Sequence, residues 1–438
     1  MLRDAQGLAV TTDSVQTIAA IDQFVDQSLS YGNHPEVILQ AIAADPACAI
    51  AYAYAASYYL SLESATGRRQ AQRLLQAALQ YQAQTNEREQ LYIQATVAWK
   101  SGEINWAIAL YEEITQKFPR DIMAVQQGQY HYFYQGNEHG LVQIATKVFA
   151  ANRENHYLHG MLAFGLEQCQ HLEEAEALGR QATTMHRHDP WAHHAVAHVM
   201  ETQGRIDEGI AWMESLADTW ENCNSMLFTH NWWHVALYYL EQEAMTQVLE
   251  LYDTHVWGRA WQQSPKDQVG AISLLLRLEL RGVDVGNRWQ TLATYLTPRI
   301  HEHSLPFQDL HYIYALARAG EVELVTEMCL SMQDYAKKVK PCLQEAWVEI
   351  TVPAARGMIA HATGDWEGAI AFLRQVLPQL HCIGGSHAQR DVFEQVYLDA
   401  WLRAEQNYQA LDLLQKRITS RRYVPSLQRG SMLQMQAS

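Results

Sequence analysis

A repeat of 34 residues is the feature that most constrains the fold of this chain. Gly102 and Gly136 are 34 residues apart, Gly204 follows after twice that interval, and Gln170 occupies the position between them. Each of the three glycines follows an apolar stretch. A fixed period of this length is typical of helix–turn–helix units in which a small residue forms the turn. The sequence therefore predicts a series of helix pairs.

The individual units repeat the same order of features. Segment 98–111 has the pattern of one helix ending, a turn at Gly102 and a second helix beginning, and segment 200–213 repeats it. Later copies at 319–324 and 363–370 have drifted from the 34-residue spacing, which indicates insertions. Prolines, which lack a backbone N–H, are expected where a second helix stops before the next unit begins. Three occupy such positions: Pro46, Pro119 and Pro190.

The units resemble tetratricopeptide repeats, and strand-like alternation is nearly absent. We therefore predict an all-α fold, a tetratricopeptide-like superhelix of helix pairs (an α-solenoid), with about two-thirds helix and little or no sheet. Residues 1–415 are expected to form a single array. The tail at 416–438 is first basic and then polar, and we expect a frayed end there.

Composition excludes several classes of protein. The 438 residues are 48% hydrophobic and 18% charged, which supplies a core and gives no sign of disorder. A net charge of −16 opposes binding to nucleic acid, whose phosphates require a basic surface. The longest weakly charged stretch, 47–60, is shorter than the roughly 20 residues that cross a bilayer, and the first residues lack a signal-peptide core. We expect a soluble, cytoplasmic protein without a membrane span.

Other motifs are absent or have an ordinary explanation. The six cysteines contain no C-x-x-C pair, which argues against a disulfide framework or a thiolate zinc site. No phosphate-binding glycine loop and no G-x-S-x-G nucleophile elbow occurs, so nucleotide-binding and serine-hydrolase interpretations lose support. The Gly384–Asp391 segment enters a helix with Ser386 as its cap. Arg390 there either helps to hold an anion or pairs with an acid.

Two H-x-x-x-H segments are the sharpest chemical signal. One pairs His194 with His198, and the other pairs His230 with His234, 36 residues further along. Residues four apart share one face of a helix, so each pair is able to direct two imidazoles to one point. Because 36 is close to the repeat length, the two pairs are expected on the first helices of neighbouring units. The four rings are therefore predicted to converge.

Neighbouring residues extend the predicted site. Glu201 follows His198 by three residues, and Tyr252–His255 ends a later helix. His159 lies 11 residues before Gln170, as His193 lies 11 residues before Gly204, so it occupies the position of His193 one unit earlier. The candidate catalytic residues are His194, His198, His230, His234, Asp253 and His255. The candidate substrate-binding residues are His159, Glu201, Trp232, Trp233, Tyr252 and Arg390. The candidate metal ligands are His194, His198, His230 and His234.

The simpler interpretation of each residue stays open. A single helical histidine is usually a satisfied core or surface residue, and at least one of Trp232 and Trp233 is expected to pack between helices. The glutamate that follows the first histidine in an H-E-x-x-H zinc helix is replaced here by Ala195. If a metal binds, imidazole-rich ligation with a carboxylate suits zinc, iron, copper or nickel rather than calcium.

In its order of segments, nearly the whole chain resembles the tetratricopeptide repeat protein 38 family. The resemblance implies the helical-repeat fold, and the family offers no general activity to transfer. The family pattern has an acid where this chain has Gly270, and a tryptophan in the stretch that here reads Leu274–Leu278, so one acid and one tryptophan are missing. The segments that carry the resemblance are 4–14, 159–167, 194–198, 230–234, 252–255, 284–289 and 384–391.

Two hypotheses for function follow from the sequence. The first is a small-molecule-binding site built from histidine, acid and aromatic side chains on the concave face. In a stronger version of this hypothesis the site is catalytic, and in the strongest version it depends on a metal. The alternative is a protein-interaction scaffold that binds a partner peptide in the groove. The sequence leaves open whether the chain is an enzyme and whether it forms a homo-oligomer.

Overall fold

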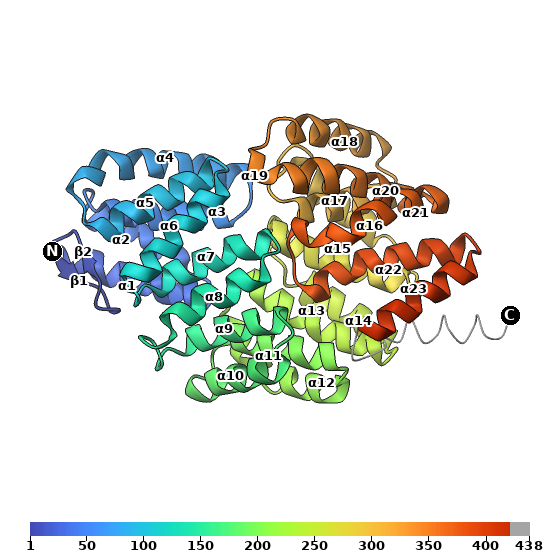
Figure 1. Cartoon of the computed structure of the whole chain (residues 1–438), viewed down its shortest axis with the longest axis horizontal. Helices are drawn as coiled ribbons and strands as arrows, with labels where there is room; N and C mark the ends of the chain where they lie inside the picture. The colour runs from blue at the N-terminus through green and yellow to red at the C-terminus, as the bar shows by residue number, and fades with distance from the viewer. Residues whose placement is uncertain (421–438) are drawn as a thin grey trace. The chain divides into compact units, whose positions relative to one another are not determined.

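The computed structural model describes residues 1–420, and within them the chain is almost entirely helical (Figure 1). Twenty-three α-helices are joined by short turns, and the one small sheet in this range pairs β1 (Leu2–Arg3) with β2 (Ala9–Val10) in antiparallel fashion. This confirms the prediction of an all-α, tetratricopeptide-like fold of helix pairs. Residues 416–420 of the predicted tail belong to the last helix, and residues 421–438 lie outside the described residues.

The helices group into two compact units, and the division between these units passes through helices α11 (Pro190–Gln203) and α13 (Ser225–Glu241). The first unit contains the helices before α11, and the second contains those after it apart from the start of α13. The predicted single array over 1–415 stays a prediction.

The first unit holds ten complete helices. They are α1 (Val15–Leu29), α2 (Ile38–Ala44), α3 (Ala49–Ser61), α4 (Ala65–Tyr81), α5 (Glu87–Lys100), α6 (Ile104–Lys117), α7 (Ile122–Tyr134), α8 (Glu138–Phe149), α9 (His156–Gln168) and α10 (Leu172–Met185). Successive members pack as pairs, most extensively α3 with α4 and α9 with α10.

The second unit holds eleven complete helices. They are α12 (Ile206–Glu214), α14 (Met245–Leu251), α15 (Pro265–Glu279), α16 (Arg288–Leu296), α17 (Pro306–Ala319), α18 (Val322–Ala336), α19 (Pro341–Gln344), α20 (Val352–Thr363), α21 (Trp366–Val376), α22 (His387–Arg403) and α23 (Asn407–Ser420). Tyr252–Val256 and Glu345–Thr351 are π-helical, and short 3₁₀ segments follow several helices. These additions account for the loss of the 34-residue spacing.

The repeat has a structural cause in the turn after each first helix. Gly102, Gly136, Gln170 and Gly204 all have positive φ, between 65° and 76°. The residue after each of them donates its backbone N–H to the carbonyl oxygen five residues earlier, over 2.9 Å. This is the Schellman helix end, which satisfies a terminal carbonyl and needs a left-handed residue, usually glycine. Gln170 keeps the same turn although its Cβ makes the left-handed conformation costly.

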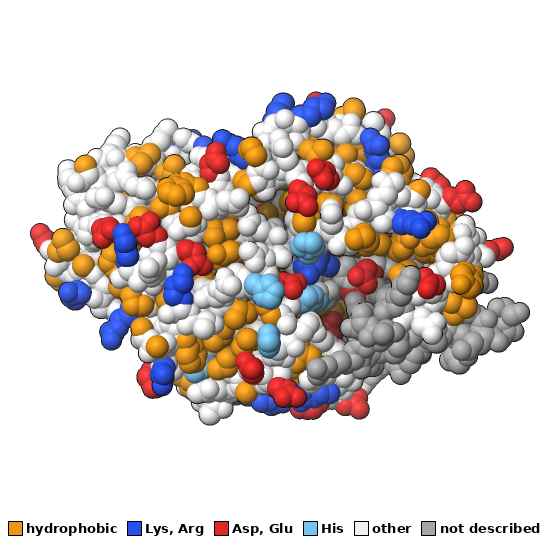
Figure 2. Space-filling model, viewed as in Figure 1, with side chains coloured by type: hydrophobic (Ala, Val, Ile, Leu, Met, Phe, Trp, Pro, Cys, Tyr) orange, Lys and Arg blue, Asp and Glu red, His pale blue; other side chains and the backbone are white. Residues whose placement is uncertain are grey.

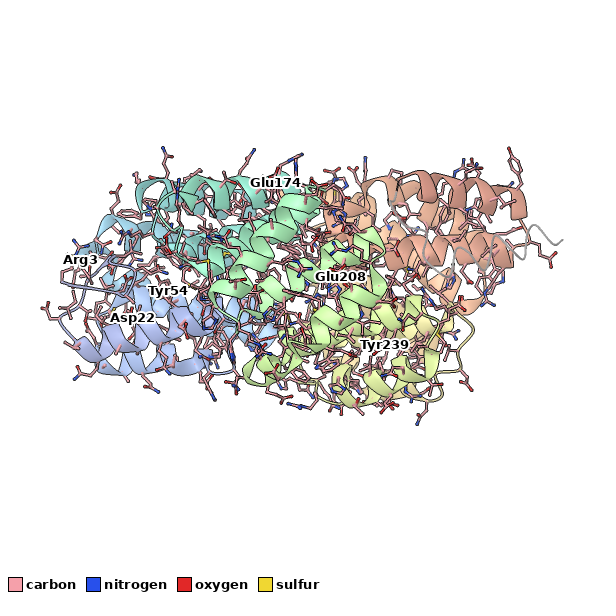
Figure 3. All side chains as sticks on the ribbon, turned by 90° about the horizontal axis from the view of Figure 1, so that it is seen from below. Arg3, Asp22, Tyr54, Glu174, Glu208 and Tyr239 are labelled. Carbon is pink, nitrogen blue, oxygen red and sulfur yellow. The ribbon has the colours of Figure 1, made fainter. Side chains whose placement is uncertain are left out.

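The core of the first unit includes stacked aromatic side chains. Tyr54 is 2% exposed and lies among the helices of this unit, whereas Glu174 lies at its outer surface (Figure 3). The Tyr54 ring meets that of Tyr92 edge-on, with centroids 4.8 Å apart, and Tyr92 meets Tyr111 in the same way at 5.6 Å. These tyrosines pack helices against one another, as expected for tyrosines repeated along helices.

No helix within the described residues combines the length and apolar character that crossing a membrane requires.

Candidate functional site

Helices α11 and α13 place two histidines each on one face. Asp189 caps the start of α11, where its Oδ1 accepts the N–H of Ala192 over 3.0 Å, and Asn224 does the same for α13 through the N–H of Leu227. Side-chain acceptors of this kind satisfy N–H groups that have no partner inside the helix. Each cap fixes where its helix begins, and the i, i+4 spacing then puts each pair of imidazoles on one side.

The structure brings together three of the histidines that the sequence predicted to converge, all of them in the second unit. Ring nitrogens of His198, His230 and His234 lie within 4.8 Å of one another. The His234 ring centroid is 4.5 Å from that of His198 and 4.9 Å from that of His230. Nitrogens bound tetrahedrally to one ion at about 2.1 Å lie about 3.4 Å apart, so inward movements of about 1 Å would bring these three to ligand distance. His194 belongs to the first unit, and its part in the site stays a prediction.

Burial disfavours the charged form of His198, His230 and His234. It lowers the pKa of His198 and of His230 well below the usual value, and neighbouring imidazoles lower both further. The pKa of His234 falls to about 3, first because the ring is buried and then because the Arg277 guanidinium is near. A neutral imidazole offers a lone pair, which is the form that binds metals and accepts protons. At neutral pH the site therefore presents several lone pairs in one place.

Glu201 orients one of the rings. Nδ1 of His234 lies 3.1 Å from Oε2 of Glu201, so Nδ1–H donates to the carboxylate and the lone pair resides on Nε2. The His234 side chain is fully buried, whereas that of Glu201 is 24% exposed. Histidines that ligate metals usually donate their other N–H to a carboxylate in this manner.

An aromatic and cationic wall lies beside the histidines. Trp233 is 1% exposed, and its ring stacks on that of His230 at 5.3 Å and 11°. The guanidinium of Arg277 on α15 lies 5.2 Å from the Trp233 ring centre, in cation–π geometry. Arg277 also donates to the carbonyl oxygen of Ala388 over 2.6 Å, which connects α15 to the first turn of α22.

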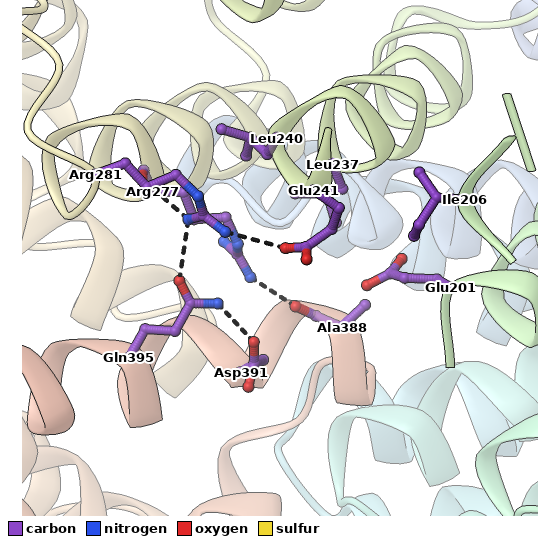
Figure 4. Close-up of a pocket in the computed structure, with 10 residues that line it drawn as sticks. All are labelled: Glu201, Ile206, Leu237, Leu240, Glu241, Arg277, Arg281, Ala388, Asp391 and Gln395. Carbon is purple, nitrogen blue, oxygen red and sulfur yellow. Dashed lines mark hydrogen bonds and ion pairs between the residues drawn. The ribbon is translucent and has the colours of Figure 1, made fainter. Parts of the chain in front are cut away.

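A small polar pocket adjoins Glu201 (Figure 4). Its volume is about 50 Å³. A water molecule needs about 10–15 Å³ of such space, so the pocket accepts a few waters or one small chemical group. Two arginines and three carboxylates face an apolar side: the lining residues are Glu201, Ile206, Leu237, Leu240, Glu241, Arg277, Arg281, Ala388, Asp391 and Gln395.

Polar groups of the pocket bind one another. Arg281, just after α15, donates to Oε1 of Glu241 on α13 over 3.1 Å, and Gln395 donates to Oδ2 of Asp391 on the same helix, α22, over 2.6 Å. Burial lowers the pKa of Arg281 in spite of these nearby acids. On the face of the molecule in Figure 2, histidine side chains likewise lie next to acidic and basic ones.

Other predicted site residues have partners outside the histidine cluster. Asp253 is exposed and forms an ion pair with Arg288 at 2.5 Å, and Tyr252 is buried below that arginine. His255 packs its ring 4.1 Å from Trp232, which is half-buried. All of these residues belong to the second unit.

His159 and Arg390 also have other partners. Nε2 of His159 bonds to the carbonyl oxygen of Arg153 over 2.8 Å, and its ring packs against Phe149 in the first unit. Arg390 donates to the carbonyl oxygen of Gly385 and lies 3.5 Å from Nδ1 of His387. Ser386 caps α22 as predicted, with its Oγ accepting the N–H of Gln389.

Sequence reasoning did not include Arg277, Arg281 or His387 among the site residues. A signal for Arg277 was present, because it interrupts the apolar run Leu274–Leu278 and a buried cation needs acceptors. Gly270 precedes it by two helical turns on α15. A Cβ at Gly270 would meet no atom within 4 Å, so the position has room for a side chain.

No family model matches the chain. Among solved structures, it is similar to a Rap protein complexed with Competence and Sporulation Factor (TM-score 0.45, 13% identity, 74% of this chain and 99% of that one). It is also similar to the human IFIT1 dimer with m7Gppp-AAAA (TM-score 0.42, 13% identity, 95% and 97%) and to the P58(IPK) TPR domain (TM-score 0.23, 10% identity, 73% and 99%). At these identities the likeness concerns the fold alone.

Proposed function

We propose that this chain binds a transition-metal ion through His198, His230 and His234 of the second unit and that it belongs to the tetratricopeptide repeat protein 38 family. The observation that carries the metal proposal is the approach of three ring nitrogens of this unit to within 4.8 Å of one another. Imidazole nitrogen suits zinc, iron, copper or nickel and does not suit calcium or magnesium.

The environment of the rings supports this proposal. When several neutral imidazoles lie together in a buried place, protonation of one ring makes protonation of the next less favourable, because the two charges repel. A single metal cation is instead bound by the lone pairs of all the rings at once. Glu201 supplies the carboxylate that fixes the tautomer of His234. A divalent ion would also be attracted by the pocket, whose three acids outnumber its two arginines.

The pocket extends the proposal to a small molecule. Glu201 belongs both to the pocket and to the hydrogen bond with His234, so a group bound in the pocket lies beside the proposed ion. A transition metal in such a place polarises a substrate oxygen or activates a water molecule. Arg277 and Glu201 would position the polar group of the ligand, and Trp233 would exclude water from the histidine side.

The test combines elemental analysis with zinc titration by calorimetry. We expect about one metal ion per chain in purified protein, and at least a 100-fold weaker zinc affinity after His198→Ala or His234→Ala, because each removes a ligand. Glu201→Gln should weaken binding about 10- to 100-fold through loss of the orienting carboxylate. His361→Gln is the matched control, since it alters a buried histidine of the same unit outside the cluster. Equal affinities in all these variants would contradict the proposal.

A second candidate function is a protein-interaction scaffold, as the fold of stacked helix pairs favours. Trp106 and Trp261 are 56% and 53% exposed, and tryptophan is enriched among residues that dominate binding energy at interfaces. Replacing Trp106 with Ser should then shift the protein from an assembly to a monomer, or abolish binding to a purified partner, with unchanged metal content. Sedimentation velocity measures the first outcome.

A further inference from the structure

A second polar cluster lies elsewhere in the second unit and takes no part in the proposed metal site. It joins Ser331 on α18, His303 in the loop before α17, and Asp309 in the first turn of α17. Nε2 of His303 lies 2.7 Å from Oγ of Ser331, and Nδ1 of His303 lies 2.5 Å from Oδ2 of Asp309. A hydroxyl, an imidazole and a carboxylate are thus hydrogen-bonded in series.

The order of these bonds sets the proton positions. The Asp309 carboxylate only accepts, so Nδ1 of His303 carries the hydrogen and Nε2 carries the lone pair. That lone pair accepts the O–H of Ser331. An imidazole held in this tautomer by a buried acid is the general base of serine-dependent acyl transfer, and the arrangement recurs on unrelated folds by geometry rather than by sequence position.

The backbone at His303 supports a role beyond packing. Its φ is +42°, a left-handed conformation that costs little for glycine and is unfavourable for any residue with a Cβ. Non-glycine residues in such conformations cluster at functional sites. The chain therefore keeps an imidazole at a turn position that glycine would occupy with less strain.

Catalysis requires an accessible nucleophile beside a base and an acid that are shielded from water, and the exposure of the three residues follows this order. The side chains of His303 and Asp309 are 2% and 1% exposed, so their hydrogen bond is shielded from water. Ser331 is half-buried on the outer helix α18, and the adjacent Leu330 is 61% exposed. Ser331 is thus more exposed than the base and the acid.

A second histidine approaches the same hydroxyl. Nδ1 of His301 lies 2.9 Å from Oγ of Ser331, and Nε2 of His301 lies 2.9 Å from Oε1 of Glu327. His301 therefore holds the Ser331 hydroxyl in place from a second side, and Glu327 holds His301 in turn.

We propose that Ser331 is a nucleophile that hydrolyses small esters with a short apolar acyl group, with His303 as its general base and Asp309 as the positioning residue. Oγ of Ser331 bonds to the ester carbonyl carbon while His303 Nε2 takes the hydroxyl proton. The carbon–alkoxide bond then breaks, and His303 returns the proton to the departing alcohol. In the second half of the reaction the oxygen of a water molecule bonds to the acyl carbon while His303 Nε2 takes a proton from that water. The bond from the carbon to Oγ of Ser331 then breaks, the proton returns to Oγ, and the acid leaves. The exposed Leu330 contacts the acyl chain.

The alternative is that these bonds merely tie the loop at His303 to α18. The absence of a G-x-S-x-G elbow does not decide between the two, because a serine within a helix would not carry that motif. Reactivity does decide, since a structural hydroxyl reacts no faster than other serines of the chain.

The full-length protein is treated with diisopropyl fluorophosphate, in which Oγ displaces fluoride from phosphorus, and the modified residue is located by peptide mass spectrometry. We expect a single adduct on Ser331 and none in Ser331→Ala. His303→Gln and Asp309→Asn should slow labelling by about 100-fold or more, the typical contribution of a general base. Asp399→Asn is the matched control, because it breaks the separate His361–Asp399 pair in the same unit.

Hydrolysis of p-nitrophenyl acetate supplies a second readout. Asp309→Asn should lower kcat with KM unchanged, which a loss of packing alone would not produce. The proposal is overturned if wild-type Ser331 is labelled no faster than other serines, or if its labelling persists in His303→Gln and Asp309→Asn. Metal content should be the same in all these variants, so the two proposals fail independently.

Discussion

Each of the two compact units buries a polar centre, and the two centres are built on opposite principles. In the first unit, the guanidinium of Arg88 lies 2.9 Å from Asp121 and 3.8 Å from Asp4, with all three side chains no more than 4% exposed. Opposite charges there compensate one another. In the second unit, His198, His230 and His234 are groups of one kind, and burial lowers the pKa of each, with His234 lowering those of His198 and His230 further.

The difference shows that the kinds of groups in a buried polar centre indicate its role. A set of opposite charges is complete without any further group and serves to hold helices together. A set of bases with converging lone pairs gains nothing for the fold by their proximity, and becomes favourable when a cation joins them. The contrast therefore predicts that changes in the first centre affect stability, whereas changes in the second affect ligand binding.

The largest effect is expected from Arg88→Leu. This change leaves two buried carboxylates without their cation, which typically lowers the free energy of unfolding by about 3–5 kcal/mol. Urea denaturation followed by circular dichroism measures the change. Zinc affinity of the folded protein should stay as in the wild type. If Arg88→Leu lowers the free energy of unfolding by less than about 1 kcal/mol, the contrast between the two centres does not hold.

A pH experiment then separates the two acids that share Arg88. Burial raises the pKa of Asp4 to about 6, although the nearby Arg88 opposes the shift. A raised pKa means that the protonated form is favoured in the folded state, so the associated stability is full below about pH 4 and is lost as the pH rises through 6. Wild type should therefore lose stability relative to Asp4→Asn between pH 4.5 and 7.

The control for this experiment is Asp121→Asn, which removes the closer partner of Arg88 and should destabilise the folded protein. Denaturation midpoints of the three proteins at four pH values supply the comparison. A constant difference between wild type and Asp4→Asn would show that Asp4 titrates as it does in the unfolded chain.

The smallest effect is expected from His230→Leu in metal-free protein. The ring is half-buried and stacks on Trp233, and leucine preserves most of that apolar contact. We expect a change in the free energy of unfolding of less than about 1.5 kcal/mol, as for other substitutions of similar volume. The same variant should lose the stabilisation that added zinc confers on the wild type, measured by thermal unfolding. A loss of 3 kcal/mol without metal would make the histidine cluster a structural centre as well.

The regular part of the fold was predictable because one local turn recurs. The left-handed position at 102, 136, 170 and 204 ends each first helix, and glycine marks it directly in three of the four copies. The loss of the 34-residue spacing in the second unit was visible in the sequence. The segments that cause it were not, since the π-helical Tyr252–Val256 and Glu345–Thr351 carry no simple periodic signal.

For the site, helical periodicity located the three clustered histidines because i, i+4 pairs one repeat apart need only adjacent helices to meet. Glu201 followed from the same reasoning. Partners distant in sequence could not be found in this way: Arg277 meets Ala388 across 111 residues. The ion pair of Asp253 with Arg288 was equally hidden, and it accounts for the position of Asp253 away from the histidines.

Gly270 has a consequence for how this site changes over time. An acid at this place would need no displacement of neighbouring atoms, because no atom lies within 4 Å of the added Cβ. It would also replace glycine in a helix interior, which by itself raises helix stability. A single change from glycine to aspartate or glutamate at this position therefore needs no compensating mutation.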